Sequence, residues 1–386
     1  MKRLVIFGLA NKNREATRNT LLCQAFSDAC DQTRYCTVDF GFARPSAKPI
    51  PKLLYGLLHA TRRWLHLGRV YISLPPYDTV FVPYPSYMDA WLACLLVRFK
   101  KKRIIIDAFL GIYDTAVRDR ELFQEKGLIA KAIWHYERWL LDSADVLLVD
   151  TEENAKMFQE DFNLPPERFV VVPVGIEESL WVPQGLPPSR HFKVVFWSTF
   201  IPLHGPDVVA HAAKELESTC PEIEFLIIGN GQLGDRFRNL VTHLKPSNLK
   251  WIDRFIPLPE IQRYVKNAHC CLGIFGKTDK AGRVIPYKAH QALASAKPLI
   301  TARTPTSERF FTDGENALLV PPRDPVTLSC ALQRLSHDRD LAARIGAAGR
   351  RLYEAQFSTR IIRKKIRELT EEGSKSANTR TQYFLK

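Results

Sequence analysis

The sequence predicts an α/β protein built from two doubly wound parallel sheets. Short apolar runs rich in Val, Ile and Leu alternate along the chain with helix-length amphipathic segments. The apolar runs lack polar alternation, as expected for parallel strands that are buried on both faces. The length of 386 residues is too great for one ordinary α/β domain and suits two, each able to bury its own core.

Strands are expected where an apolar run leads into a polar or Gly-containing turn. In the first half they are Leu4–Phe7, Thr79–Val82, Arg103–Ile106, Val146–Val149 and Phe169–Val172. In the second half they are Lys193–Trp197, Glu224–Ile228, Leu249–Ile252, Cys270–Ile274, Pro298–Thr301 and Ala317–Val320. Helical patterns such as Glu15–Cys30 and Pro206–Glu217 lie between them.

The boundary between the domains is expected within Glu177–His191. This stretch contains VPQGLPPSRH, which is dense in Pro and Gly, and a new strand-loop-helix pattern follows it. We therefore predict a first domain over residues 1–180 and a second over 190–357. The segment 358–372 is predicted to form a last helix that packs back on the first domain, followed by a flexible tail over 373–386.

Composition restricts the possible partners and the compartment. The chain has 55 Lys and Arg against 41 Asp and Glu, a formal net charge of +14. Such a surplus favours a phosphorylated substrate or an anionic membrane surface. We do not expect nucleic acid, because no recognised reading motif accompanies the charge. No segment reaches the roughly 20 apolar residues of a membrane span, and the N-terminal apolar stretch is too short for a signal peptide.

The eight cysteines show neither a CxxC pair nor a metal-ligand spacing. Buried, reduced thiols are therefore expected, which suits a cytoplasmic protein. Together with the charge, this predicts a protein that is soluble or sits peripherally on the inner face of the cell membrane.

The most informative motif lies between Gly273 and Pro322. An apolar run ends at Phe275, a Gly-containing loop follows, and Pro286 stands where a helix would begin. The free N–H groups of a helix over about residues 287–296 would provide a site for a phosphate or diphosphate. The spacing by itself also permits an ordinary basic helix entrance.

This motif resembles the nucleotide-sugar-binding segment of glycosyltransferase family 4, a large family of retaining enzymes with the GT-B fold. The shared order is a strand, a loop, a Pro-x-Lys step, a helix, a Pro-hydrophobic-hydrophobic step and an E-N-x-hydrophobic-L-V-P-P closing at Glu315–Pro322. The resemblance is close from Lys193 to about Phe357 and loose before it. It implies two facing Rossmann-like domains with a deep inter-domain cleft, a nucleotide-sugar donor, and neither a metal nor another cofactor.

The family's two glutamates, eight residues apart, fall here on Arg283 and Gln291. The second glutamate accepts hydrogen bonds from the donor ribose, and Gln291 can accept one and donate one. Arg283 excludes the usual acidic contact and suggests a cation at the diphosphate. With Lys288 it would stabilise the departing diphosphate, and these two residues are catalytic candidates.

The family's phosphate-binding arginine and lysine fall on Thr199 and His204 of STFIPLHG, so two usual cations are absent. Arg283 and Lys288 would stand in for them. Gly229, in the turn IIGNGQ, and Thr306 complete the predicted donor-binding set.

In the first half, Asp107 ends a predicted strand, where ligands of open α/β sheets gather. It is the candidate for binding or orienting the acceptor hydroxyl, with Asp114 second, and the alternative for Asp107 is a turn or helix cap. Gly8 and Arg14, in the first strand-to-helix turn, would contact donor phosphate or acceptor, or would belong to a plain loop.

Two basic segments point to a surface partner. Lys52–Arg69 combines Leu and Trp64 with arginines, and Arg98–Arg103 is a compact cationic run. They predict contact with anionic lipid headgroups or a lipid-linked acceptor; the alternative is a solvated edge and a helix packed on its own domain.

These features predict a retaining glycosyltransferase that moves a sugar from a nucleotide sugar to a glycan or lipid-linked acceptor, in cell-surface polysaccharide synthesis of the bacterial type. Two alternatives stay open. One is a catalytically degenerate, GT-B-like protein that only binds nucleotide sugars, which the departures at Thr199 and His204 permit. The other is a sugar-nucleotide epimerase of similar fold.

Overall fold

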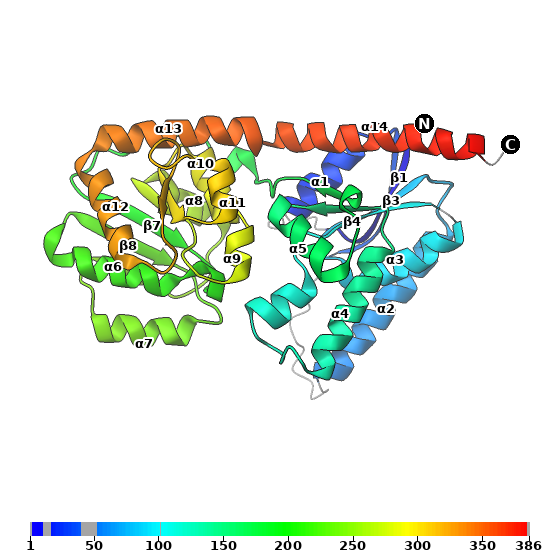
Figure 1. Cartoon of the computed structure of the whole chain (residues 1–386), viewed down its shortest axis with the longest axis horizontal. Helices are drawn as coiled ribbons and strands as arrows, with labels where there is room; N and C mark the ends of the chain where they lie inside the picture. The colour runs from blue at the N-terminus through cyan, green and yellow to red at the C-terminus, as the bar shows by residue number, and fades with distance from the viewer. Residues whose placement is uncertain (1, 11–16, 40–51, 101, 384–386) are drawn as a thin grey trace.

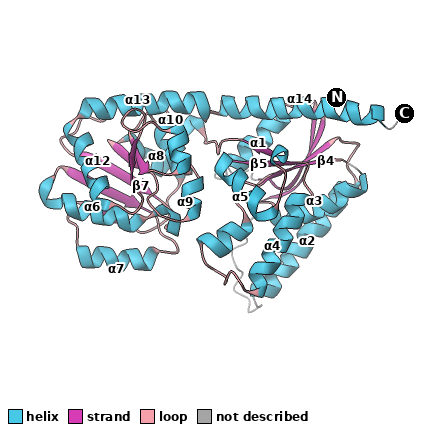
Figure 2. Cartoon of the chain, in the orientation of Figure 1, coloured by secondary structure: helices cyan, strands magenta, loops and turns pink. Residues whose placement is uncertain are grey.

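Two parallel sheets, each of six strands, form the framework of the computed structural model, which describes residues 2–10, 17–39, 52–100 and 102–383. Helices cover both faces of each sheet, and the two α/β domains face each other (Figures 1 and 2). The expected fold class is therefore confirmed.

The first sheet has the order β2-β1-β3-β4-β5-β6, with all neighbours parallel. Its strands are β1 (Arg3–Ala10), β2 (Gln32–Asp39), β3 (Thr79–Val82), β4 (Arg103–Asp107), β5 (Val146–Val149) and β6 (Phe169–Val171). The sequence analysis missed β2. This strand lies at the edge with β1 as its partner, so much of it is exposed and it lacks the apolar run of a central strand.

The helices of the first domain are α1 (Thr17–Asp28), α2 (Lys52–Ile72), α3 (Tyr87–Lys100), η1 (Asp114–Asp119), α4 (Leu128–Asp142), α5 (Glu152–Phe162) and η2 (Pro166–Arg168). Alternate residues of β1 face opposite layers, as the pleat requires. Val5 and Phe7 belong to the core shared with α2, α3, α4 and α5, whereas Leu4 and Ile6 belong to the core shared with α1.

The second sheet has the order β12-β11-β10-β7-β8-β9 and is also parallel. Its strands are β7 (Phe192–Trp197), β8 (Ile223–Ile228), β9 (Leu249–Ile252), β10 (Cys270–Leu272), β11 (Leu299–Ala302) and β12 (Leu318–Val320). The chain passes from the first sheet to the second between Val171 and Phe192.

The helical elements after β6 are η3 (Glu178–Leu180), η4 (Pro202–His204), α6 (Pro206–Thr219), α7 (Gly234–Leu244), α8 (Leu258–Lys266), α9 (Asp279–Arg283), α10 (Tyr287–Ala294), α11 (Pro305–Phe310), α12 (Pro325–His337), α13 (Arg339–Gln356) and α14 (Thr359–Tyr383). In the second sheet the strand order reverses between β10 and β7. Loops that leave these two strands therefore diverge and leave a crevice at their carboxyl ends.

The last two helices connect the domains. In Figure 1, α13 on the second domain and α14 on the first run almost end to end along one side of the molecule. Ile362 and Ile366 of α14 enter the core beside α1. At the junction, Glu178 accepts hydrogen bonds from the Tyr353 hydroxyl at 2.9 Å and from the Thr359 N–H at 2.7 Å. These hydrogen bonds join the two segments in which the chain passes from one domain to the other, near Glu178 and near Thr359.

Helix α14 continues to Tyr383, beyond the end expected at residue 372. The segment 373–383, expected to be a flexible tail, is helical in this structure. No proline follows Gly373, so nothing in the sequence there forces the helix to stop.

Candidate active site

A pocket of about 260 Å³ lies at the C-terminal ends of β7 and β8, and we call it the β7–β8 pocket. Its walls come from the loops after β7, β8 and β9 and from the start of α10. It is lined by Trp197, Ser198, Thr199, His204, Ile228, Gly229, Arg254, Phe255, Ile256, Leu258, Ile261, Pro286, Tyr287, Lys288 and Gln291. Five of the residues proposed from the sequence therefore lie around one cavity: Thr199, His204, Gly229, Lys288 and Gln291.

Two glycines of the loop after β8 allow the pocket to form. Gly229 has φ +124° and Gly231 has φ +157°, and a Cβ at either position would lie 1.9 Å from a carbonyl oxygen of Ser198 or Thr199. Any side chain would push the loops after β7 and β8 apart. The turn IIGNGQ is thus required for the close approach of these two loops.

Lys288 is the most unusual residue of the pocket. Its side chain is only 5% exposed, and its Nζ has no hydrogen-bond partner among the residues that the structure describes. The Nζ lies 3.9 Å from the centre of the Phe196 ring, which offers a cation–π contact and no acceptor. Burial holds the pKa of Lys288 well below its ordinary value, because the charged form is desolvated. An anion entering the pocket would supply the missing partner.

Gln291 lies one helical turn after Lys288 and is also buried. Its Oε1 accepts a hydrogen bond from Trp197 Nε1 at 3.0 Å, so the side chain is held in one orientation. Its Nε2 has no partner among the described residues. The structure therefore assigns the acceptor side of the amide to Trp197 and leaves the donor side for a ligand oxygen.

His204 closes the other wall of the pocket. Its Nδ1 lies 2.7 Å from Ser198 Oγ, which also accepts a hydrogen bond from the Phe200 N–H at 3.0 Å. Burial, with the nearby charges of Lys288 and Arg120, keeps the pKa of His204 well below its usual value. The ring is therefore neutral, and Nδ1 either accepts from the Ser198 hydroxyl or donates to it, depending on which ring nitrogen carries the proton. With the proton on Nε2, His204 would offer an N–H donor to a ligand in the pocket.

Arg283 is engaged differently from the expectation. It ends α9, and its Nη2 donates to Asp114 Oδ1 in η1 of the first domain. Lys280 of α9 lies 3.3 Å from the other oxygen of Asp114, and both of these side chains are buried. The charge of Arg283 is thus used in a contact between the domains, because α9 packs against η1. Its buried Nε lacks a partner among the described residues.

Thr306, the remaining donor-binding candidate of the second domain, also lies at the domain contact. Its hydroxyl is 2.9 Å from the Gly282 carbonyl and 3.2 Å from Glu153 Oε2 of α5, and it does not line the β7–β8 pocket. Thr151 of the first domain donates to the Arg283 carbonyl at 2.6 Å. Helices α9 and α11 thus form a polar seam with η1 and α5.

Asp107 has a partner inside its own domain. Arg18 donates to both carboxylate oxygens, at 2.8–3.1 Å, and also to the carbonyls of Val172 and Pro173. Both Arg18 and Asp107 are buried. The proposed contact of Asp107 with an acceptor hydroxyl stays a prediction, and in this structure its carboxylate is engaged by Arg18. The sequence could not show this, because Arg18 is distant in the chain and reaches β4 only after folding.

The other first-domain candidates also receive new assignments. Gly8 has φ +107°, and a Cβ there would lie 2.7 Å from Ser86 Oγ, so its role is a close approach to the start of α3. Asp114 lies at the domain contact described above. Arg14 lies outside the described residues.

Several residues of the site carried no clear sequence signal. Trp197 orients Gln291, and Arg254–Ile256 form a wall of the pocket after β9. All polar residues that follow a predicted strand could have been treated as site candidates, because the carboxyl ends of parallel strands lie at the same edge of the sheet. That rule would also have found Asp150 after β5, a buried carboxyl whose pKa burial raises to about 6.

The basic segments of the first domain lie on α2 and the end of α3, which run side by side (Figure 1). Trp64 does not project freely, because its Nε1 is 3.1 Å from Asp89 Oδ1 and its ring packs edge-on against Trp91. The exposed apolar residues nearby are Leu65, Ile72 and Phe99. Within the described residues, no helix combines the length and hydropathy that crossing a bilayer requires.

Cys220, Glu222 and His337 have ligand atoms within 4.8 Å of one another, the arrangement in which a metal could be held. They lie near the start of β8, at the opposite end of this strand from the pocket. The cysteines of the described chain are all free thiols.

Comparisons with known proteins agree with this geometry. Residues 179–352 match the family described as glycosyl transferases group 1, and residues 18–175 match the glycosyl transferase 4-like domain. The chain therefore belongs to the group 1 glycosyl transferases.

Among curated relatives, the D-inositol 3-phosphate glycosyltransferase of Corynebacterium efficiens is 27% identical over 228 residues, 54% of this chain and 52% of the relative. The match thus spans about half the length of that relative. Among solved structures, the sucrose-phosphate synthase of Thermosynechococcus elongatus aligns with a TM-score of 0.72 and 16% identity over 96% of this chain and 99% of that one. Anabaena HepE in complex with UDP-glucose aligns with a TM-score of 0.68 and 13% identity over 96% and 100%. These structural likenesses establish the GT-B-like fold.

Proposed function

We propose that this protein is a retaining glycosyltransferase that takes a sugar from a nucleotide-sugar donor bound in the β7–β8 pocket. The observation that carries the proposal is Lys288, a buried amino group at the first turn of α10 that has no hydrogen-bond partner among the described residues. Such a group is costly to bury unless a ligand completes it. The family membership and the UDP-glucose bound to HepE, a protein of the same fold, support a nucleotide sugar as that ligand.

The pocket offers a distinct partner for each part of the donor. The nucleobase would lie against the loop Arg254–Ile256, and Gln291 Nε2 would donate to a ribose oxygen. The diphosphate would meet Lys288, the free N–H groups at the start of α10 and the Nε2–H of His204. Thr199 would add a hydroxyl in place of the family's arginine.

The protein's chemical contribution would be electrostatic. As the bond from the anomeric carbon to the diphosphate breaks, negative charge grows on the leaving group. Lys288 would bind a proton and hold that charge in a site with little water, where such an interaction is strong. Arg283 could join it only by giving up part of its contact with Asp114. The chemistry assigned to this chain's own residues thus requires neither a metal nor a redox cofactor.

The acceptor is proposed to be a glycan or a lipid-linked saccharide, reached at an anionic membrane surface from the cytoplasm. The support is the formal charge of +14 and the exposed Leu65, Ile72 and Phe99 beside the basic ends of α2 and α3. Basic side chains near anionic lipid contribute roughly 1 kcal/mol each. Synthesis of a cell-surface polysaccharide would fit such a location.

The test is a thermal-shift series with UDP, GDP, ADP and their glucose conjugates, followed by a transfer and hydrolysis assay on each nucleotide sugar that binds. We expect stabilisation by one nucleotide series and release of its diphosphate. Binding without turnover would favour a degenerate binding protein, and conversion of the sugar without release of nucleotide would favour an epimerase. Absence of binding in every series would refute the donor pocket.

A further inference from the structure

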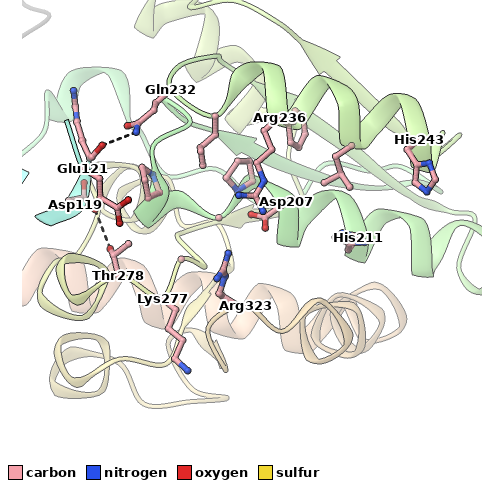
Figure 3. Close-up of a pocket in the computed structure, with 18 residues that line it drawn as sticks. Asp119, Glu121, Asp207, His211, Gln232, Arg236, His243, Lys277, Thr278 and Arg323 are labelled. Atoms are coloured by element: carbon pink, nitrogen blue, oxygen red, sulfur yellow. Dashed lines mark hydrogen bonds between the residues drawn. The ribbon is translucent and has the colours of Figure 1, made fainter. Parts of the chain in front are cut away.

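A second and larger cavity, of about 650 Å³, lies on the other side of the β7–α6 connection from the β7–β8 pocket. We call it the α6 groove, and Figure 3 shows it with its lining side chains. Its walls are the first turns of α6 and α7, the loops after β10 and β12, and residues 119–121 of the first domain. Because the loops after β7 and β10 both line it, the groove occupies the crevice where the strand order of the sheet reverses.

Three arginines line the groove. Arg120, Arg236 and Arg323 are exposed, and none of their side chains makes a hydrogen bond or ion pair with a residue that the structure describes, so their charges face the solvent of the groove. By contrast, Arg238 on the same helix as Arg236 is paired with Asp235 and Asp253 and points elsewhere. In Figure 3, Arg236 from α7 and Arg323 from the loop after β12 extend into the groove from opposite sides, towards the start of α6.

The start of α6 adds to this positive field. The helix has 14 residues and its N-cap is Gly205; Pro206 has no N–H and the Val208 N–H donates to the Gly205 carbonyl at 3.2 Å, so the Asp207 N–H is the free donor of the first turn, and no side chain of the described residues caps it. The positive end of the helix dipole thus opens into the groove between the two arginines. The acids of the groove are Asp119, Glu121 and Asp207, and Asp207 forms an ion pair with neither Arg236 nor Arg323 within the described structure.

Asp119 supplies the second, independent feature. Only 3% of the surface of Asp119 is exposed, and its Oδ1 accepts a hydrogen bond from the Thr278 hydroxyl at 3.2 Å. Its Oδ2 has no partner among the described residues. Buried carboxylate oxygens are almost always hydrogen-bonded, so this atom points to a ligand that donates, such as a hydroxyl group.

The wall that carries Asp119 is fixed across the domain contact. Gln232, in the loop between β8 and α7, donates a hydrogen bond to the Arg120 carbonyl at 3.0 Å, and Figure 3 shows this bond. Residues 119–121 are therefore held against the second domain, and the arginines and the carboxylate belong to one cavity.

We propose that the α6 groove is a second ligand site, separate from the donor pocket, that binds a phosphorylated saccharide or polyol. Arg236, Arg323 and the start of α6 hold the phosphate, because planar guanidinium groups and helix N–H groups are suited to its oxygens. Asp119 accepts a hydrogen bond from a hydroxyl of the same molecule. In the proposed function, on which this role rests, the ligand is the phosphorylated part of the acceptor, such as the phosphate that links a saccharide to its lipid.

The first experiment measures binding to the full chain by isothermal titration, with the β7–β8 pocket saturated by the nucleoside diphosphate that stabilises the protein most. The probes are glucose 6-phosphate, glycerol 3-phosphate, glucose and inorganic phosphate. We expect a phosphorylated polyol or saccharide to bind more tightly than glucose or inorganic phosphate. The double variant Arg236→Gln/Arg323→Gln should lose about tenfold or more in affinity, whereas Arg238→Gln should bind as wild type.

The second experiment separates this inference from the proposed function. In Lys288→Met protein without nucleotide, the phosphorylated probes should bind, and adding the two groove substitutions should again reduce their affinity about tenfold or more. If wild type binds no nucleotide, the donor pocket is refuted, but the measurement on Lys288→Met protein without nucleotide still tests the groove. Equal binding by wild type and the double variant, or no binding by any phosphorylated probe, would overturn the groove proposal. Unchanged nucleotide affinity of the double variant shows that it is folded.

Discussion

The substitution Lys288→Met removes a buried amino group but keeps most of the volume of the side chain. In the structure, Nζ makes a cation–π contact with Phe196 and has no hydrogen-bond partner among the described residues. A buried polar group without a hydrogen bond costs about 1–3 kcal/mol in proteins. We therefore expect methionine to stabilise the unliganded protein by an amount of this order, with a rise in Tm of roughly 2–4 °C per kcal/mol.

The same substitution should weaken binding of a nucleoside diphosphate. A hydrogen bond to a charged group contributes roughly 1.5–3 kcal/mol, which corresponds to a loss of about 10- to 150-fold in affinity. The combination of higher Tm and lower affinity is characteristic of a side chain retained for binding at the expense of stability. Thermal melting and isothermal titration on the same preparation measure both quantities.

Lys297→Met is the matched control. Lys297 is as buried as Lys288, but its Nζ donates to the carbonyls of Gly185 at 3.0 Å and Lys266 at 2.9 Å, away from the pocket. Its loss leaves two buried acceptors unpaired, so Tm should fall while nucleotide affinity stays unchanged. If Lys288→Met lowers Tm as Lys297→Met does, or binds nucleotide as wild type does, the reasoning about Lys288 is wrong.

Nucleoside diphosphate binding should take up a proton and weaken as pH rises, because the lowered pKa of Lys288 rises again beside the diphosphate; titration in buffers of different ionisation enthalpy should show this uptake in wild type and less of it in Lys288→Met. Folding stability of the unliganded protein changes with pH in the other direction, because the unfolded chain binds more protons at Lys288 than the folded chain does. The wild type therefore gains stability as pH rises, and the stability difference between wild type and Lys288→Met should shrink as pH increases towards the ordinary lysine pKa. Asp114→Asn removes the negative charge that faces Arg283 and Lys280 at the domain contact, although Lys280 keeps its hydrogen bond to Thr115 Oγ1, and it should cost about 3–5 kcal/mol, seen as a lower Tm and a larger radius of gyration by X-ray scattering; unchanged values would show that the pair does not hold the domains together. Gln291→Leu should weaken a ribonucleotide more than its 2′,3′-dideoxy form; Gln291→Glu still accepts from Trp197, and its second oxygen can accept from a ribose hydroxyl in place of the Nε2–H bond, so it should be tolerated; equal losses for both nucleotides would remove Gln291 from the ribose site. Phe99→Ser, at a side chain that is 87% exposed, should reduce sedimentation with anionic vesicles at low salt, and Val326→Ser, at an exposed apolar residue of the second domain, should not; identical behaviour would place the membrane contact elsewhere.

The local pattern of the chain was sufficient for the architecture. Central parallel strands are apolar throughout because both faces are covered, so runs such as Val146–Val149 and Leu249–Ile252 could be recognised directly. The edge strand β2 escaped because one neighbour and an exposed edge impose no such composition. The motifs from Lys193 onwards also predicted a common site for five residues, because each lies close to the end of a strand or the start of a helix. In the structure these residues line one cavity: Lys288, Gln291, Thr199, His204 and Gly229.

What the sequence alone could not decide is which charges are free. Asp107, Arg283 and Lys288 are equally plausible ligand contacts in the chain, but folding pairs Asp107 with Arg18 and Arg283 with Asp114, and it leaves the Lys288 amino group without a hydrogen-bond partner in the described part of the chain. Arg18 and Asp107 are separated by 89 positions in the sequence, and Asp114 and Arg283 by 169, so no local sequence pattern predicts either pair. Burial then sets the consequence, because a desolvated charge must be paired, neutralised or completed by a ligand. The strand and helix pattern determined where a ligand could bind, and the tertiary contacts decided which side chains remain to bind it.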